Sequence, residues 1–352
     1  MKYDVKKILK KAVDEDVSDI FFVAGSPYSF LKNGTIQKMT DEKLMPADTE
    51  DIIKQLYAID GTKDFKKFLE TGDDDYSFSL PKVGRFRINA YRQRNSLAAV
   101  LRVVKFGIPD YTKLNIPQEV VDLFSTKKGM ILVSGPAGSG KSTTLACIVD
   151  KINENRSCHI VTLEDPIEYL HSHKKAIVSQ REIFHDSKDY LGALRAALRE
   201  KPECILLGEM RDPETIATAI TAAETGHLLL SSLHTVGAVN TIDRIVDSFA
   251  NNKEQIRLQL SQVLAAVVSE QLIPTVDGGI TPVFEVMKVN VAIRSQIREN
   301  KLHLIENSML SARNEGMFTM DDSLYDLYKR GIITRETALL YSVHPDVFER
   351  KI

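Results

Sequence analysis

The segment at residues 130–152, MILVSGPAGSGKSTTLACIVDKI, most constrains what this chain can fold into. An apolar run typical of a buried strand opens directly into a glycine-rich loop with the spacing Gly-x-x-x-x-Gly-Lys-Ser, and a helical stretch follows. Such a loop turns successive backbone N–H groups inward around an anion, and the positive end of the helix faces the same anion. The segment therefore predicts a strand, a phosphate-binding loop and a helix, and with them a nucleotide site.

Each part of this loop has an expected task. Lys141 is expected to reach the β and γ phosphates of ATP, and Ser142 to hold Mg²⁺. A competing explanation is a glycine-rich turn that merely joins a strand to a helix. Glycine, lysine and hydroxyl at the required spacings, directly after a strand, favour the phosphate site. The predicted nucleotide-binding residues are Gly135, Pro136, Ala137, Gly138, Ser139, Gly140, Lys141, Ser142 and Thr143.

Length and composition narrow the class of protein. The 352 residues exceed one typical domain and predict two, each with its own core. The 46 lysines and arginines nearly cancel the 48 acidic residues, so no bulk positive field favours nucleic acid. No apolar run approaches the ~20 residues that span a bilayer, and we expect a cytosolic protein. Three widely separated cysteines in apolar segments predict reduced, buried thiols and no structural zinc: Cys147, Cys158 and Cys204.

The first part of the chain, residues 1–104, has the pattern of a small α+β domain. Apolar residues from Val5 to Val13 follow helical spacing, and residues 48–58 also favour a helix. Short alternating segments predict strands, with a hairpin signal at Asn33-Gly34. The prolines in residues 105–117 resist regular structure, so this segment is interpreted as a linker.

The second part, residues 118–352, alternates between helix and strand. Its apolar runs ILVSG, HIVTLE, CILLGE and LLLSSLH are separated by helical segments, which predicts a mainly parallel sheet covered by helices on both faces. Ligands of such sheets lie beyond the carboxyl ends of the strands. From about residue 252 the pattern predicts helices, and the clearest is QIRLQLSQVLAAVVSEQL at 255–272.

Polar residues at the ends of these strands are candidates for chemistry. Glu164 could orient and deprotonate an attacking water, or simply cap a turn. Glu209 could support Mg²⁺ or its waters, or form a surface ion pair with Arg211. His227 and His234 bracket one strand, and a spacing of seven puts them on opposite faces. A lone histidine is usually structural, but the position of His234 favours contact with the γ-phosphate.

Five arginines fall within an eighteen-residue window of the first domain. Strand alternation makes a solvated basic face the default interpretation. A guanidinium can also neutralise charge on a transferring phosphoryl group. The arginines are Arg85, Arg87, Arg92, Arg94 and Arg102.

Four segments, taken in order, resemble boxes of the secretion ATPase superfamily, and within it the PilT-type retraction ATPases of type IV pili. The resemblance covers nearly the whole chain. The boxes are GPAGSGKSTT at 135–144 (the phosphate loop), VTLEDPIEY at 161–169 (the Asp box), LREKPECILLGEMRD at 198–212 (Walker B) and TGHLLLSSLHT at 225–235 (the His box).

Two further segments resemble the retraction branch of the superfamily. Residues 84–102 are similar to the arginine-bearing end of the family's N-terminal domain, and AIRSQIRENK at 292–301 is similar to its retraction-specific helix. In that helix the isoleucines at 293 and 297 form one stripe and the arginines at 294 and 298 an adjacent one. An ordinary amphipathic helix has the same spacing. Extension and type II secretion relatives usually carry a four-cysteine zinc insertion, which this chain lacks.

The resemblance implies a PAS-like first domain and a RecA-like second domain with a helical C-terminal part, assembled as a homohexameric ring with nucleotide between the two domains. It implies that Arg87 and Arg102 contact phosphate. It also gives Glu164 the position of the catalytic base, Glu209 the Walker B position that supports the metal, and His227 and His234 the His box positions.

The implied function is a Mg²⁺-dependent ATPase motor that powers pilus retraction. It would act on the pilin filament indirectly, through an inner-membrane platform protein, from the cytoplasmic face of the membrane. Three alternatives are an extension or secretion ATPase, an assembly factor that binds ATP with little turnover, and a nucleic-acid motor. The 292–301 segment argues against the first, the retained Lys141, Glu164 and Glu209 against the second, and the balanced charge against the third.

Overall fold

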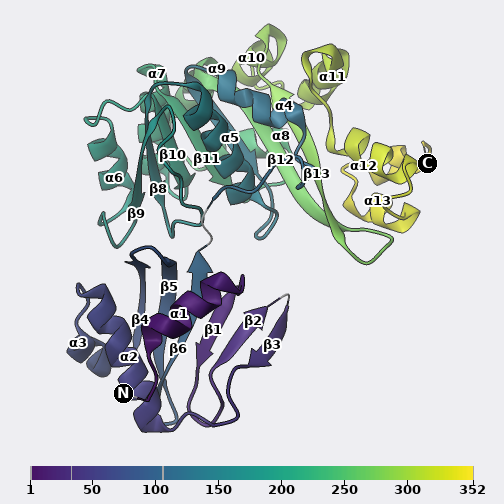
Figure 1. Ribbon diagram of the computed structural model, residues 1–352. Helices are drawn as coiled ribbons and strands as arrows, with labels where there is room; N and C mark the ends of the chain where they lie inside the picture. The colour runs from purple at the N-terminus through teal and green to yellow at the C-terminus, as the bar shows by residue number, and fades with distance from the viewer. Residues whose placement is uncertain (1, 33, 105–106, 352) are drawn as a thin grey trace. The chain divides into compact units, whose positions relative to one another are not determined.

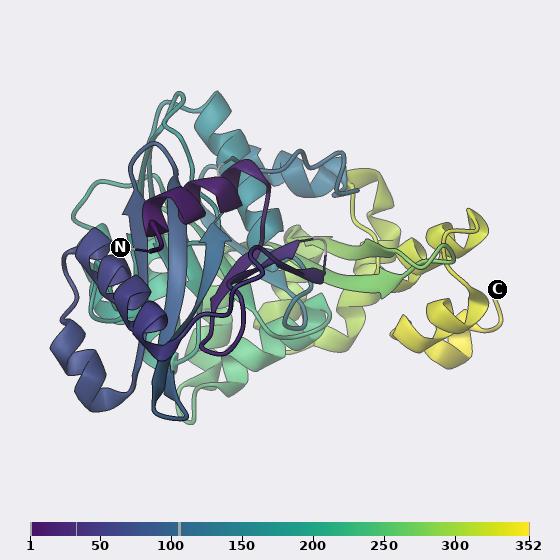
Figure 2. The same ribbon diagram turned by 60° about the horizontal axis from the view of Figure 1, so that its bottom comes forward.

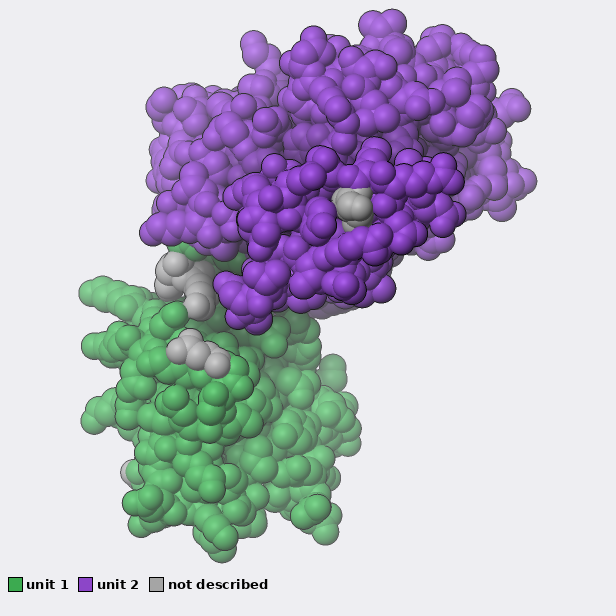
Figure 3. All heavy atoms as spheres, turned by 90° about the vertical axis from the view of Figure 1, so that its right-hand side faces the viewer, with its two compact units in different colours: residues 1–107, 166–170 green, residues 108–165, 171–352 purple. Residues whose placement is uncertain are grey.

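The computed structural model describes residues 2–32, 34–104 and 107–351. It divides into two units (Figure 3). Unit 1 holds residues 1–107 and 166–170, and unit 2 holds residues 108–165 and 171–352. Residue 33 of the predicted Asn33-Gly34 turn lies outside the described residues, although the strands on either side of it do pair.

Unit 1 is built on a six-stranded antiparallel sheet with the order β3-β2-β1-β6-β5-β4. The predicted first helix is confirmed, with Val5, Ile8, Leu9 and Ala12 buried on one face. The α+β class of this domain is likewise confirmed. Its elements are α1 (Val5–Asp14), β1 (Asp19–Phe22), β2 (Ser29–Lys32), β3 (Thr35–Lys38), α2 (Pro46–Asp60), α3 (Phe65–Thr71), β4 (Asp73–Leu80), β5 (Gly84–Gln93) and β6 (Ser96–Val104).

One face of this sheet carries the core of unit 1. Along β5, Phe86, Ile88 and Ala90 are fully buried in a single apolar cluster, to which α1 and α2 also contribute. Because side chains alternate along a strand, the residues between them point to the other face. Arg85 and Arg87 therefore lie on that polar face.

Unit 2 contains a seven-stranded sheet with the order β13-β12-β7-β11-β10-β8-β9 (Figure 1). All neighbouring strands are parallel except the β12–β13 pair, so the predicted mainly parallel sheet is confirmed. The strands are β7 (Gly129–Ser134), β8 (His159–Glu164), β9 (Ile177–Glu182), β10 (Cys204–Glu209), β11 (Leu228–Leu233), β12 (Leu264–Pro274) and β13 (Ile280–Lys288).

Helices cover both faces of this sheet (Figures 1 and 2). Successive residues of β7 point to opposite faces of the sheet, so that Met130 packs in one apolar cluster and Ile131 packs in another. No described helix has the length and apolar character needed to cross a membrane. The helices are α4 (Gln118–Val121), α5 (Lys141–Asn155), α6 (Tyr190–Ala197), α7 (Pro213–Glu224), α8 (Ala238–Asp247), α9 (Lys253–Val263), α10 (Val291–Arg298), α11 (Ile305–Ser311), α12 (Met320–Lys329), α13 (Arg335–Tyr341) and α14 (Pro345–Phe348), with 3₁₀ turns at Asp122–Ser125, Leu302–Leu304 and Arg313–Glu315.

The helix predicted over residues 255–272 is wrong in its second half. Helix α9 ends at Val263, and Leu264–Pro274 forms β12, which lies between β7 and β13 in the sheet. A strand buried on both faces has a nearly continuous apolar sequence, which periodicity cannot distinguish from a buried helix. Strand β13 also lies in the region that was predicted to be helical.

Most of the predicted linker at 105–117 belongs to unit 2. Ile116 is buried in the core of that unit, and Ile108, Tyr111 and Leu114 pack against the same core. Residues 105 and 106 lie outside the described part of the chain. The segment from residue 108 onward therefore packs against unit 2 and is not a free linker.

Candidate nucleotide-binding site

The glycine-rich loop joins the end of β7 at Ser134 to the start of α5 at Lys141. A Cβ atom on Gly135 would lie 2.2 Å from the carbonyl oxygen of Glu270, so no other residue fits there. Gly140 caps α5 with φ of 106°, a conformation that side-chain-bearing residues rarely adopt. Local space and backbone conformation thus require two of the glycines that the motif supplies.

Lys141 folds back over this loop. Its Nζ donates to the carbonyl oxygens of Gly135 at 2.9 Å and Pro136 at 2.7 Å, and the side chain is buried. Carbonyl oxygens are neutral acceptors, and phosphate oxygens are stronger ones for an ammonium group. The Lys141 ammonium group is therefore held at the loop by weak acceptors, which it can exchange for the oxygens of a bound phosphate.

The carboxyl ends of four adjacent parallel strands, β7, β11, β10 and β8, line one edge of the sheet. The loop follows β7, His234 follows β11, Glu209 ends β10 and Glu164 ends β8. His234 Nε2 lies 3.3 Å from Oε2 of Glu209, and the Arg211 guanidinium pairs with Oε1. Glu209 therefore does form the ion pair with Arg211, while it also reaches His234.

Glu164 is held by two residues that the sequence did not reveal. Thr162 Oγ1 donates to Oε1 of Glu164 at 2.6 Å, and Gln180 Nε2 donates to the same oxygen at 3.2 Å. Gln180 in turn accepts the His171 backbone N–H at 2.8 Å. Thr162 and Gln180 thus fix the orientation of the carboxylate. Gln180 lies on the edge strand β9, and its sequence gives no signal of this contact.

Tyr190, at the start of α6, is a further side chain at these strand ends. A Cβ on Gly208 would lie 3.0 Å from its hydroxyl oxygen. Burial, and then the charges of Glu209 and Asp165, raise the pKa of the Tyr190 phenol. The phenol therefore stays protonated and presents a hydrogen-bond donor beside the acidic strand ends.

His227 is not brought to this edge within the chain. The register pairs Leu228 with Gly129 at the start of β7, whereas Leu233 pairs with Ser134 at its end. His227 thus lies at the amino end of β11, with Nδ1 3.0 Å from the carbonyl oxygen of Ala222. A role for His227 at a nucleotide requires a site other than the loop of its own chain.

Arg87 and Arg102 are direct neighbours across β5 and β6 in unit 1. Arg87 makes a bidentate contact with Asp75, at 3.1 Å and 2.6 Å, and Arg102 Nε contacts Asp19 Oδ1 at 3.1 Å. The structure thus brings these two arginines together, each paired with a carboxylate. Charge-assisted pairs of this kind are geometrically specific, so moving either arginine to a phosphate means exchanging one anion for another.

The donor set at the sheet edge suits Mg²⁺. Ser142 is exposed on the first turn of α5 and offers a hydroxyl, and Glu209 offers a carboxylate. Mg²⁺ keeps several waters and is usually held by one or two protein oxygens together with phosphate oxygens. Among the described residues, no group of three His, Cys, Asp or Glu side chains could hold a metal ion alone. The residues present therefore fit a metal that arrives with phosphate.

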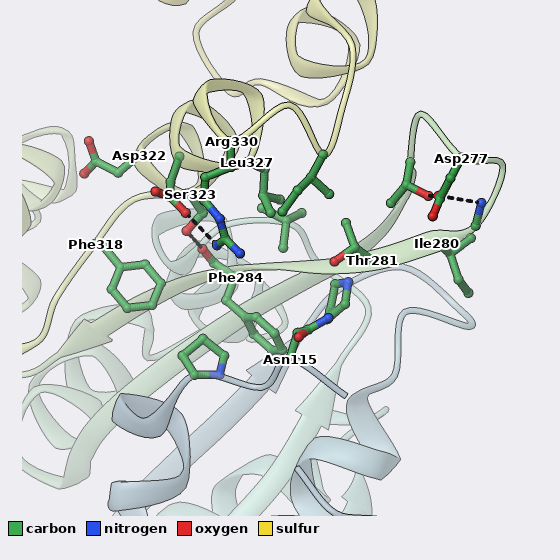
Figure 4. A pocket seen from close by; sticks show the side chains of 17 residues that line it. Asn115, Asp277, Ile280, Thr281, Phe284, Phe318, Asp322, Ser323, Leu327 and Arg330 are labelled. Atoms are coloured by element: carbon green, nitrogen blue, oxygen red, sulfur yellow. Dashed lines mark hydrogen bonds and ion pairs between the residues drawn. The ribbon is translucent and has the colours of Figure 1, made fainter. Parts of the chain in front are cut away.

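A cavity of about 570 Å³ elsewhere in unit 2 contains none of the predicted nucleotide-site residues (Figure 4). It lies between β13 and α12, with Phe284 and Thr281 on one side and Ser323 and Leu327 on the other. The nucleotide site is therefore placed by the glycine-rich loop and the strand ends, and not by this cavity.

A strand-to-helix phosphate loop, with acidic residues at the ends of neighbouring parallel strands, defines a P-loop nucleotide-binding protein of the RecA-like type. The family model described as "Type II/IV secretion system protein" matches residues 1–282. The chain belongs to this family, and the resemblance inferred from the four boxes is confirmed.

Individual relatives match nearly the whole chain. The type IV pilus retraction ATPase PilT of Pseudomonas aeruginosa is 39% identical over 98% of this chain and 100% of its own length. A twitching motility protein of Neisseria gonorrhoeae is 39% identical over 96% of this chain and 90% of that protein. The crystal structure of the pilus retraction motor PilT with bound ADP is 45% identical, with a TM-score of 0.90 and 99% of each chain covered. The two-domain α/β fold is therefore established.

Proposed function

We propose that this chain is an ATP-hydrolysing motor that powers retraction of type IV pili. The observation that carries the proposal is the grouping of the P loop, His234, Glu209 and Glu164 along one sheet edge, in a chain similar to a retraction ATPase over 98% of its length. Deletion of its gene should leave cells with excess pili that do not retract. Normal retraction in the deletion strain, observed by fluorescence microscopy of labelled pili, would reject the proposal.

The P loop binds the phosphates of ATP. Backbone N–H groups of the loop and the amino end of α5 face the anion, and Lys141 exchanges the carbonyl oxygens of Gly135 and Pro136 for the β and γ phosphate oxygens. Ser142 and Glu209 hold Mg²⁺ or its waters. When bound, the metal neutralises charge on the phosphates.

Glu164 acts on the attacking water. Because Thr162 and Gln180 fix one carboxylate oxygen, the carboxylate is oriented to accept a proton from that water. The water oxygen bonds to the γ phosphorus as the bond to ADP breaks, and the proton moves to Glu164. His234 contacts the Glu209 carboxylate, and through this contact it senses whether the γ-phosphate is present.

Arg87 and Arg102 complete the site from the first domain, in a homohexameric ring with nucleotide between the two domains. Their charges stabilise the negative charge that develops on the γ-phosphoryl group. Each arginine leaves its present carboxylate to do so, which ties hydrolysis to movement of the first domain. The ring acts at the cytoplasmic face of the membrane on a platform protein, and on pilin only indirectly.

Helix α10 transmits motion in this proposal. Ile293 and Ile297 are fully buried and anchor it, while Arg294 and Arg298 are exposed. Replacing both arginines with alanine should leave ATP hydrolysis within about twofold of wild type, because surface substitutions away from a site change little. Retraction should nevertheless fall strongly. Retraction and ATPase activity are to be measured on the same double variant.

The matched control removes two exposed positive charges at the end of α12 instead, from Lys329, its last residue, and Arg330, its C-cap. It should retract normally. Normal retraction in the α10 variant would show that this helix only packs, and parallel loss of ATP binding would place the arginines in the nucleotide site.

A further inference from the structure

Glu270 is a buried carboxyl group beneath the P loop with no part in the mechanism above. It lies in the middle of β12 and is only 1% exposed. Its Oε2 accepts a hydrogen bond from Thr144 Oγ1, on α5, at 2.5 Å. Its Oε1 is buried and has no hydrogen-bond partner among the residues that the structure describes. A carboxyl group in this state is costly unless it is neutral or meets a positive charge.

Glu270 contacts the loop at both ends, through its backbone at Gly135 and through its carboxyl group at Gly140. The backbone carbonyl oxygen of Glu270 lies 2.2 Å from where a Cβ of Gly135 would be, and Oε1 lies 3.2 Å from the corresponding position on Gly140. The partnerless oxygen thus faces the turn that precedes Lys141. Glu270 forms the floor of the loop that receives phosphate.

Burial raises the pKa of Glu270 to about 7, while the Thr144 hydrogen bond and the Lys141 charge lower it. From α5, Lys141 and the Cys147 thiol face this carboxyl group, and burial raises the pKa of Cys147 to about 12, so that thiol stays neutral. On the neighbouring strands, Phe284 of β13 pairs with Glu270, and Ser134 of β7 pairs with the preceding residue. The lysine is therefore the charge that acts on Glu270.

We propose that Glu270 takes up a proton from solvent when nucleotide phosphates enter the P loop, and that the neutral carboxyl group then positions the loop through Thr144. The inference rests on the proposed nucleotide site. Phosphate brings negative charge above the floor and draws Lys141 toward itself, and both changes favour the protonated carboxyl group. An ionised Glu270 would instead place a fixed negative charge beneath the phosphates.

The sign of the pH dependence follows from this scheme. The pKa of Glu270 is higher with nucleotide bound than the value of about 7 without it. Well below pH 7 the group is protonated in both states, so binding takes up no proton. Above pH 7 binding requires a proton, and nucleotide affinity falls by up to about tenfold per pH unit until the higher pKa is passed.

Isothermal titration calorimetry of MgADP into the full chain tests the proposal. Titrations in two buffers of different ionisation enthalpy, at pH 6 and pH 8, give the number of protons taken up. Wild type should take up about 0.5–1 proton at pH 8 and almost none at pH 6. Glu270→Gln should bind without uptake at either pH. Glu285→Gln, which replaces another buried carboxyl group, is the matched control and should behave as wild type.

Binding without proton uptake in wild type, or equal uptake in Glu270→Gln, would overturn the proposal while leaving the nucleotide site intact. Absence of MgADP binding at every pH in wild type would instead reject the nucleotide site, and this inference with it. The two failures are therefore distinguishable.

A second measurement needs no nucleotide. Because the folded-state pKa of Glu270 lies above its ordinary value of 4.5, the folded protein holds more protons, and stability falls as pH rises from about 4.5 to 7. Glu270→Gln should raise the melting temperature relative to wild type more at pH 8 than at pH 5. An equal shift at both pH values would mean that Glu270 only packs beneath the loop, and would contradict its titration.

Discussion

Glu164→Gln should bind ATP with near wild-type affinity and hydrolyse it about 10²–10⁴-fold more slowly. Glutamine has nearly the same shape and leaves the P loop untouched, but it cannot accept the proton of the attacking water. Its oxygen can still accept the hydrogen bond of Thr162, so the local structure should persist. Phosphate release and nucleotide affinity, measured on the same preparation, separate the chemical step from binding.

Glu168→Gln is the matched control, because it changes an exposed carboxylate four residues further along the same segment. It should hydrolyse ATP at the wild-type rate. Near wild-type turnover in Glu164→Gln would remove Glu164 from the role of base.

Arg102→Ala should lower turnover by about 10³-fold or more, as expected for a residue that stabilises transition-state charge, with little change in ATP affinity. The change also leaves Asp19, whose side chain is only 12% exposed, without its cation. Thermal melting must therefore show that the variant is folded. Arg92→Ala, which removes an exposed arginine from the adjacent strand, is the control and should stay active.

Mixing variants tests whether the arginine acts across subunits. Lys141→Ala protein lacks a working P loop but keeps Arg102, and Arg102→Ala protein has the converse defect. Mixed rings should regain part of the lost turnover if the arginine of one subunit serves the nucleotide of another. No gain in rings shown to be mixed would mean that each arginine serves its own chain, and full activity of Arg102→Ala alone would reject its catalytic role.

Local spacing predicted much of the sheet-edge site. The Gly-x-x-x-x-Gly-Lys-Ser motif located the loop, and apolar runs ending in Glu164 and Glu209 predicted strands with acidic ends. The loop motif and each apolar run are short, continuous stretches of the sequence. Because the strands are parallel and neighbouring, their polar ends meet at one edge without further information.

Contacts between distant segments were not predictable in this way. Thr144 and Glu270 are 126 residues apart, and the segment that contains Glu270 was predicted to be helical. A lone acidic residue within an apolar run was the available signal, since ionisable groups are rarely buried without a partner or a function. The position of His227 depends on the direction of β11. His227 precedes this strand and His234 follows it, so only His234 lies at the carboxyl edge of the sheet with the P loop.

Motor function is tested most directly by pilus retraction in cells whose only copy of the gene encodes Glu164→Gln. With ATP binding retained and hydrolysis lost, these cells should assemble pili and fail to retract them, while cells carrying Glu168→Gln should retract normally. Wild-type retraction rates in cells that depend on a hydrolysis-deficient chain would contradict the conclusion that ATP hydrolysis by this protein drives the movement.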